Sequence, residues 1–206
     1  MPELEGLMWQ PSLLDAAEPL ADPCFAGLVR HDLDQTAWVD FVPGWLSGPE
    51  EVFAGLLAEA PWEGRDRHMY GQVVAQPRLT AWWDASQGGV AFLQVVEDMR
   101  VALSARYGVD FDSVGLNLYR DGDDSVAWHG DRISRRIVDP LVAIVSLGQA
   151  RRFLLRPRPG GGSRRFVPRS GDLLVMGGSC QRTWQHCVPK VASAGPRISV
   201  TFRHSA

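Results

Sequence analysis

Residues 141–155 read LVAIVSLGQARRFLL, two short apolar runs separated by a break at Gly148. Similar short runs occupy 114–119, 173–176, 184–188 and 198–202, and Gly, Pro or Asp residues separate them. Runs of this length, bounded by turn formers, are typical of β-strands. The segment from 114 onward is therefore predicted to form an antiparallel barrel or sandwich.

Two helices are predicted ahead of these strands. The sequence Ser47-Gly-Pro-Glu50 opens one that continues through Leu57, with proline in its first turn. Apolar residues at helical spacing over 90–106 predict the second. Since the helices precede the strands instead of alternating with them, we expect them to pack outside the β-structure. Residues 62–83 have the broken pattern of a hairpin.

The length and composition favour one intracellular domain. The 206 residues are enough for a single core, which we place at 37–206, after an acidic extension at 1–36. No apolar stretch is long enough to span a membrane, and the acidic N-terminus does not resemble a secretion signal. The three cysteines contain no CxxC pair, which favours a reducing cytoplasm over disulfides or a zinc cluster. We expect a cytoplasmic monomer.

The net charge of −3 conceals a strong asymmetry along the chain. Residues 1–63 hold twelve acidic residues and one basic residue, whereas 64–206 hold twenty basic and twelve acidic residues. The stretch 151–169 alone contains seven arginines and no acid. A basic C-terminal part is compatible with phosphate contacts, although an arginine-rich loop can also be a solvated surface.

The sequence His129-Gly-Asp131, followed much later by His186, is a candidate metal site. Two histidines and one carboxylate can occupy one face of an octahedral iron(II) and leave the other positions open. Residues two apart on a strand project to the same side, so His129 and Asp131 could face one ion. Taken alone the pattern is weak, because short HxD sequences also occur by chance.

From 114 to 203 the chain resembles the AlkB family of nucleic-acid oxidative demethylases. Four blocks occur in the order of that family: NLYRDG at 117–122, HGD at 129–131, GDLLVMGG at 171–178 leading to Arg182 and His186, and RISVTFR at 197–203. The last block is close to the R-x-N-x-T-F-R sequence of the family. The resemblance implies an α+β, mainly-β fold, with a double-stranded β-helix (jelly-roll) core at 114–206 and a nucleotide-recognition lid at 62–83.

The same resemblance assigns the cofactors, which are Fe(II) and 2-oxoglutarate, with O2 as cosubstrate. His129, Asp131 and His186 would hold the metal. The 2-oxoglutarate pocket would be formed by Asn117, Tyr119, Arg197, Ser199 and Arg203, where Ser199 replaces the asparagine of the family. The resemblance assigns the distal carboxylate to Arg197 and the metal-proximal end to Arg203. Residues six apart on one strand point to the same face, so both arginines are expected to face the pocket.

The implied reaction is demethylation of N-alkylated bases, in DNA more than in RNA, with release of formaldehyde, succinate and CO2. A base must leave the duplex to reach a buried metal, and aromatic side chains can stack on it. The residues expected to contact substrate are Tyr70, Trp82, Trp83, Arg156, Arg158 and Arg182. Trp82 and Trp83 could equally be core residues, and exposed arginines could be free in solvent.

Two alternatives to a nucleic-acid demethylase stay open. Many AlkB relatives carry an acidic residue two positions after the aspartate ligand, where this chain has Ile133. Its absence favours an oxygenase that acts on a small molecule or a protein side chain. A barrel that binds nucleic acid without catalysis is the other alternative, and the intact ligand pattern opposes it.

Overall fold

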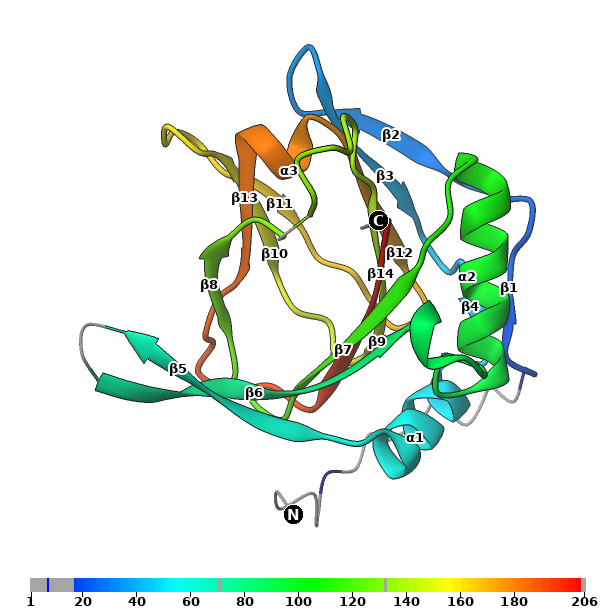
Figure 1. Ribbon diagram of the computed structural model, residues 1–206. Helices are drawn as coiled ribbons and strands as arrows, with labels where there is room; N and C mark the ends of the chain where they lie inside the picture. The colour runs from blue at the N-terminus through cyan, green and yellow to red at the C-terminus, as the bar shows by residue number, and fades with distance from the viewer. Residues whose placement is uncertain (1–6, 8–16, 70–71, 132, 205–206) are drawn as a thin grey trace.

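The computed structural model of the protein describes residues 7, 17–69, 72–131 and 133–204. The larger of its two main antiparallel sheets has eight strands (Figure 1). In spatial order they are β2 (Val29–Asp32), β3 (Ala37–Val42), β12 (Leu173–Gly178), β9 (Val142–Gly148), β14 (Arg197–Arg203), β7 (Ser113–Tyr119), β6 (Gln72–Asp84) and β5 (Glu63–Met69).

The smaller sheet has four strands and lies opposite the larger one (Figure 1). Its strands are, in spatial order, β11 (Arg164–Phe166), β10 (Phe153–Pro157), β13 (Trp184–Val188) and β8 (Val126–His129). A short pair joins β1 (Leu20–Ala21) to β4 (Leu46–Ser47). One apolar cluster fills the space between the two main sheets, with Val142 and Met176 from the larger and Leu155 from the smaller sheet.

Two helices cover the outer face of the larger sheet (Figure 1). Helix α1 (Pro49–Glu59) follows Gly48, whose φ of 56° lies in the left-handed region, and it begins with proline. Helix α2 (Gln94–Tyr107) ends at Gly108, also left-handed. Their buried residues, Phe53 and Leu103 among them, share a second core with the sheet. No helix of the described part of the chain is long and apolar enough to cross a membrane.

The mainly-β architecture with helices outside is as predicted. All six strands predicted after residue 113 are present, with ends that differ by at most two residues from the expected ones. The second helix begins at Gln94 and not at 90, because the chain has positive φ at Gly88, Gly89 and Phe92 before it. The 62–83 hairpin is formed by β5 and β6.

Six strands were not predicted, namely β1, β2, β3, β4, β8 and β11, because tertiary pairing outweighs their local sequence. Strand β2 lies within the expected acidic extension, is exposed along its length and pairs with β3. Strand β11 lies in the arginine-rich segment and pairs with β10. Strand β8 pairs with β13 through only two residue positions. The part of the extension that covers 1–6 and 8–16 lies outside the described residues.

Candidate active site

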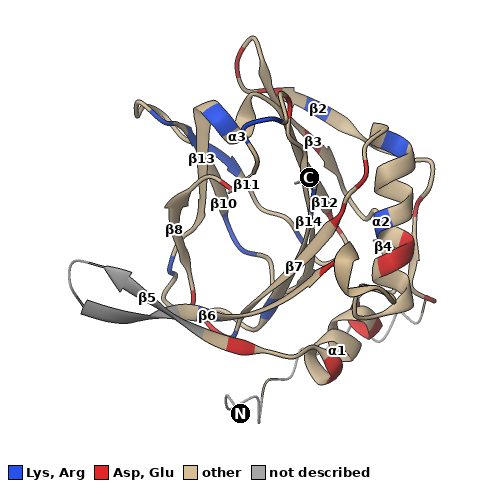
Figure 2. Cartoon of the chain, in the orientation of Figure 1, with Lys and Arg blue, Asp and Glu red and all other residues tan. Residues whose placement is uncertain are grey.

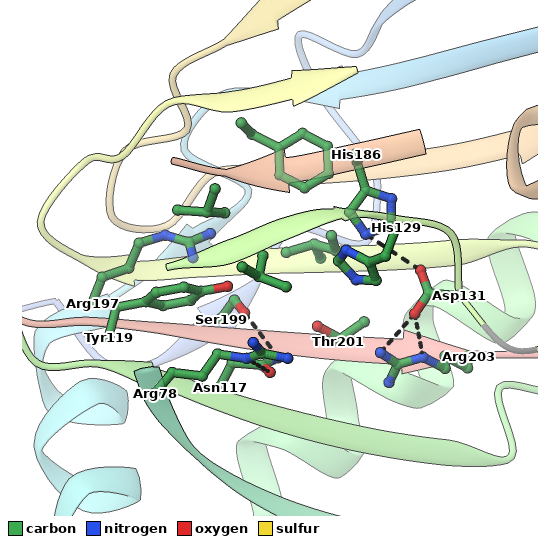
Figure 3. Close-up of a pocket in the computed structure, with 14 residues that line it drawn as sticks. Arg78, Asn117, Tyr119, His129, Asp131, His186, Arg197, Ser199, Thr201 and Arg203 are labelled. Atoms are coloured by element: carbon green, nitrogen blue, oxygen red, sulfur yellow. Dashed lines mark hydrogen bonds and ion pairs between the residues drawn. The ribbon is translucent and has the colours of Figure 1, made fainter. Parts of the chain in front are cut away.

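A pocket opens between the two sheets, and residues from both line it (Figure 3). The smaller sheet and the segment after β8 contribute Val126, His129, Asp131, Phe153, His186 and Val188. The larger sheet contributes Arg78, Asn117, Tyr119, Ile144, Arg197, Ser199, Thr201 and Arg203. Every residue that the sequence assigned to metal or 2-oxoglutarate is therefore present in one cavity.

The two histidines face each other across neighbouring strands. His129 ends β8 and is the register partner of His186 in β13, and their ring centroids are 4.3 Å apart. Nδ1 of His129 lies 2.9 Å from the carbonyl oxygen of Ala127. That contact fixes the ring and leaves Nε2 as the nitrogen available to a ligand. His186 is buried, and burial, opposed by Asp131, lowers its pKa to about 3.

Asp131 lies two residues beyond His129, beside both rings. Its Oδ1 accepts a hydrogen bond from Nε of Arg203 at 2.8 Å, and its Oδ2 lies 3.6 Å from Nε2 of His186. Burial raises its pKa, but the charges of Arg203 and the two histidines outweigh burial and lower it to about 2. The carboxylate is thus ionised at neutral pH, and its buried Oδ2 has no hydrogen-bond partner.

These three side chains fit a metal ion by the chemistry of their donors. A buried carboxylate oxygen without a partner and two imidazoles at contact distance are the features that a cation would satisfy. As the side chains stand, no group of three His, Cys, Asp or Glu residues in the described part of the chain is already arranged to hold an ion. Oδ1 of Asp131 is directed toward Arg203, as Figure 3 shows, and Oδ2 has no hydrogen-bond partner.

Strand β14 supplies one wall of the pocket through residue alternation. Arg197, Ser199, Thr201 and Arg203 line the cavity, and the intervening Ile198, Val200 and Phe202 are in the core with the helices. The predicted common face of Arg197 and Arg203 is therefore confirmed.

Arg197 is a buried guanidinium with unused donors. It is 1% exposed, and its Nη2 donates to Oγ of Ser146 at 2.9 Å. Its Nε and Nη1 are buried and have no hydrogen-bond partner. The side chain lies 5.2 Å from the ring of Tyr119, its register partner on β7. Burial lowers the pKa of Arg197. An anion in the pocket would therefore balance the buried positive charge and accept hydrogen bonds from the unpaired donors.

Arg78 is a pocket residue that was expected in the lid and not beside the cosubstrate residues. Its Nε donates to Oδ1 of Asn117 at 2.9 Å, and Nδ2 of Asn117 reaches Oγ of Ser199 at 3.4 Å. Side chains alternate along β6, so Arg78 and Trp82 lie on the opposite face from the core residues Leu79 and Trp83. This alternation is the sequence signal that could have placed Arg78 in the pocket.

Gln181 is a second residue that the sequence reasoning missed. It is 2% exposed, and its Oε1 accepts a hydrogen bond from the backbone N–H of Asp131 at 3.2 Å. It belongs to α3 (Cys180–Thr183), a four-residue helix that leads into β13. The segment that carries His186 therefore also positions Asp131. Cys180, beside Gln181, and Cys187, beside His186, are buried free thiols.

The expected substrate contacts separate into several groups. Trp83 is 7% exposed, donates through Nε1 to the carbonyl of Gly88 and belongs to the core, so its assignment to substrate was wrong. Trp82, on the opposite face of the strand, is 41% exposed and lies 5.2 Å from the guanidinium of Arg203. Tyr70 lies outside the described residues.

The arginines also have different roles. The guanidinium of Arg156 stacks on the ring of Trp128 at 4.2 Å. Arg158 lies against Gly130, the residue between the candidate ligands His129 and Asp131. The guanidinium of Arg182 donates to the carbonyls of Ile133, Ser134 and Ile137, so it holds the loop after Asp131 and is not free for substrate.

Ile133 is buried in the core between the sheets, with 7% of its surface exposed. The position that carries an acid in many AlkB relatives is thus occupied here by a packing residue.

Comparison with known proteins agrees with this geometry. Residues 42–203 match the model of the 2OG-Fe(II) oxygenase superfamily. The chain is 33% identical over 182 residues to alpha-ketoglutarate-dependent dioxygenase alkB homolog 3 of Bos taurus, which covers 78% of this chain and 64% of the bovine protein. It is 32% identical over 190 residues to DNA oxidative demethylase ALKBH2 of Arabidopsis thaliana, with 73% and 60% covered. The chain thus spans less than two thirds of these relatives.

A solved structure shows the same fold. An oxidoreductase of the 2OG-Fe(II) oxygenase family from Burkholderia pseudomallei superposes with a TM-score of 0.56 at 17% identity, covering 81% of this chain and 84% of that one. The two-sheet arrangement with external helices is the double-stranded β-helix expected from the sequence.

Proposed function

The chain belongs to the 2OG-Fe(II) oxygenase superfamily, and from that membership we propose that it demethylates N-alkylated bases of nucleic acid, DNA in preference to RNA. One observation carries the proposal. One pocket joins a two-histidine, one-carboxylate set to a buried arginine whose Nε and Nη1 lack hydrogen-bond partners. The first set is suited to iron(II), and the second is suited to a carboxylate.

His129, Asp131 and His186 would hold the metal. Arg197 would bind the distal carboxylate of 2-oxoglutarate, with Asn117, Tyr119 and Ser199 around it. When bound, iron and 2-oxoglutarate supply the oxidising power that hydroxylates an N-methyl carbon with O2, after which formaldehyde leaves.

The chain's own residues would bind and orient the metal and 2-oxoglutarate, and they would keep water away from them. Arg203 keeps Asp131 ionised and fixes one of its oxygens, so Oδ2 stays available for the metal. The ring contact of Phe153 with His186, with centroids 5.2 Å apart, shields that ligand from solvent. Arg203 was expected to reach the metal-proximal end of 2-oxoglutarate, and its Nη1, buried without a partner, remains the donor for that contact.

The preference for nucleic acid rests on the positions of the charges. Figure 2 shows basic residues along β11 and the neighbouring hairpin, whereas α1 carries acidic residues and no basic one; α2 carries both kinds. Arg158, Arg164 and Arg165 are exposed. The named function of the Arabidopsis relative, DNA oxidative demethylase, supports the same substrate.

The test is turnover on N-methylated oligonucleotides, measured as formaldehyde together with the restored base. Asp131→Ala is expected to abolish turnover and Mn(II) binding, because it removes one of three ligands. His31→Ala is the matched control, since this exposed histidine lies outside the pocket. Normal turnover by Asp131→Ala would refute the metal assignment.

A second candidate function keeps the oxygenase but changes its substrate to a small molecule or a protein side chain. Ile133 favours it, because this buried isoleucine stands where many AlkB relatives carry an acidic base contact. Succinate release without any oligonucleotide binding, insensitive to salt, would support this alternative.

A further inference from the structure

Arg151 belonged to the arginine-rich stretch expected to contact phosphates, but the structure places it inside the protein. It is 3% exposed, while its neighbour Arg152 is exposed. Its Nη1 donates to the carbonyl of Asp121 at 2.7 Å, and its Nη2 donates to the carbonyls of Asp124 and Pro189 at 2.9 Å each. A phosphate group in solution cannot reach this side chain.

The guanidinium of Arg151 lies behind the candidate cosubstrate pocket. Its centre is 5.8 Å from the ring of Tyr119, and the guanidinium of Arg197 is 5.2 Å from the same ring. Two buried cations therefore adjoin one pocket-lining tyrosine. Burial lowers the pKa of both guanidinium groups, and the charge of Arg151 further lowers the pKa of Arg197.

In the part of the chain that the structure describes, no carboxylate accepts a hydrogen bond from either guanidinium, although the charges of Asp124 and Asp121 raise the pKa of Arg151. All three hydrogen bonds of Arg151 go to backbone carbonyls, and its buried Nε has no partner. The nearby carboxylate of Asp124 accepts hydrogen bonds from the side chain of Arg120, and Asp121 accepts from the backbone of Asp123 and Asp124. A neutral donor could also hydrogen-bond to the three carbonyls. Holding them together therefore does not explain why a charged side chain is buried at this position.

We propose that Arg151 is a positioning residue for the cosubstrate: it holds Tyr119 beside Arg197 and adds a second buried positive charge behind the pocket. The pocket thereby favours a 2-oxo acid that carries a second carboxylate over one that ends in a methyl group. This inference rests on the proposed function, because it assumes that Arg197 binds the distal carboxylate.

The experiment compares two ligands of equal chain length, 2-oxoglutarate and 2-oxopentanoate, by calorimetry with the Mn(II)-loaded protein in the absence of oxygen. In Arg151→Met, the dissociation constant for 2-oxoglutarate is expected to rise about tenfold, since a buried charge near its carboxylate is lost. The constant for 2-oxopentanoate and the affinity for Mn(II) should stay within about twofold of wild type, because neither depends on that charge.

The matched control is Arg152→Met, which removes the same charge from an exposed neighbour and is expected to leave both constants unchanged. Arg151→Lys retains the charge but loses the three-carbonyl geometry. It should lower the melting temperature yet keep most of the preference for 2-oxoglutarate. This variant carries the test if Arg151→Met does not fold.

The inference is overturned if Arg151→Met weakens both ligands equally, which indicates a purely structural role, or if it weakens neither. Arg197→Met removes the proposed carboxylate anchor and should abolish the preference for 2-oxoglutarate over 2-oxopentanoate. An equal loss of this preference in Arg151→Lys would also overturn the inference. Failure of the wild-type protein to bind 2-oxoglutarate would instead refute the proposed function, so the two failures are distinguishable.

Discussion

Asp131 has two tasks, which its two oxygens divide between them. Oδ1 receives Arg203 from the larger sheet, and Oδ2 faces His186. The backbone N–H of the same residue is held by Gln181. The sequence could predict which residue types hold a metal, because the donor set determines that chemistry. It could not predict Gln181, because a buried glutamine that bonds a backbone group carries no sequence pattern of its own.

The burial of His186 predicts how the metal-free protein responds to acid. An unfolded histidine takes up a proton near its ordinary pKa of 6.5, whereas in the folded chain its pKa is lowered to about 3. The unfolded state therefore binds more protons between these values, and stability falls as the pH drops through that window. We expect the free energy of unfolding, measured with chelator present, to decrease from pH 7.5 to pH 5.

His186→Leu should show a flatter dependence over the same range, since it removes the group that titrates. Identical slopes for the two proteins would contradict the assignment of this dependence to His186.

Gly130 separates two candidate ligands and makes room for Arg158. A Cβ at this position would lie 2.5 Å from Nη2 of Arg158, which is the end of a flexible side chain. Gly130→Ala is therefore expected to fold and bind Mn(II), but to displace Arg158 from the surface it occupies. The salt slope is the slope of the logarithm of the binding constant against the logarithm of the salt concentration. For single-stranded oligonucleotides its magnitude should fall by about 0.7, which corresponds to the loss of one phosphate contact.

Arg158→Ala should lower that slope by the same amount, and combining the two changes should add nothing further. Additive effects would show that Gly130 acts through a residue other than Arg158.

Among the elements, β14 was predictable and α3 was not. The seven residues of β14 alternate between pocket and core, so a period of two predicts both its strand character and the common face of its arginines. Helix α3 has four residues, too few for any periodic signal. Only the fold shows that Gln181 and Arg182 of this helix hold Asp131 and the backbone of 133–137.

The role of α3 leads to a prediction for Arg182→Met. The variant loses three hydrogen bonds to the carbonyls of the loop after Asp131. We expect faster amide hydrogen exchange in 133–137 and weaker Mn(II) binding, because the adjoining ligand is less well fixed. Arg165→Met is a suitable control, since this arginine is exposed on β11. Unaltered exchange in the loop would show that other contacts hold it.

For the whole molecule, the charge asymmetry along the chain places basic residues on β11 and its hairpin and acidic residues on α1. The sequence predicted a basic C-terminal part, but it could not distinguish surface arginines from Arg151, which is buried and bonded to carbonyls. Burial of a charged residue depends on which backbone carbonyls the fold brings around it, and these come from segments near 121, 124 and 189.

The exposed arginines predict salt-dependent binding to oligonucleotides. The double variant Arg164→Ala and Arg165→Ala should reduce the magnitude of the salt slope by up to about 1.4 on single strands, which corresponds to two contacts. Binding of 2-oxoglutarate should be unchanged, because neither side chain lines the pocket. The same slope as wild type would exclude β11 from the nucleic-acid surface.

The two sheets contribute different halves of the pocket, and this division has a mechanical consequence. The metal-binding candidates lie on the smaller sheet or directly after it, whereas Arg197 and Arg203 lie on a strand of the larger one. A metal that carries a chelated dicarboxylate would cross-link the two layers. Stretched between a handle on β10 and another on β14, the loaded protein should resist separation of its sheets at higher force than the empty one. Its stiffness would then report cosubstrate occupancy without any chemical turnover.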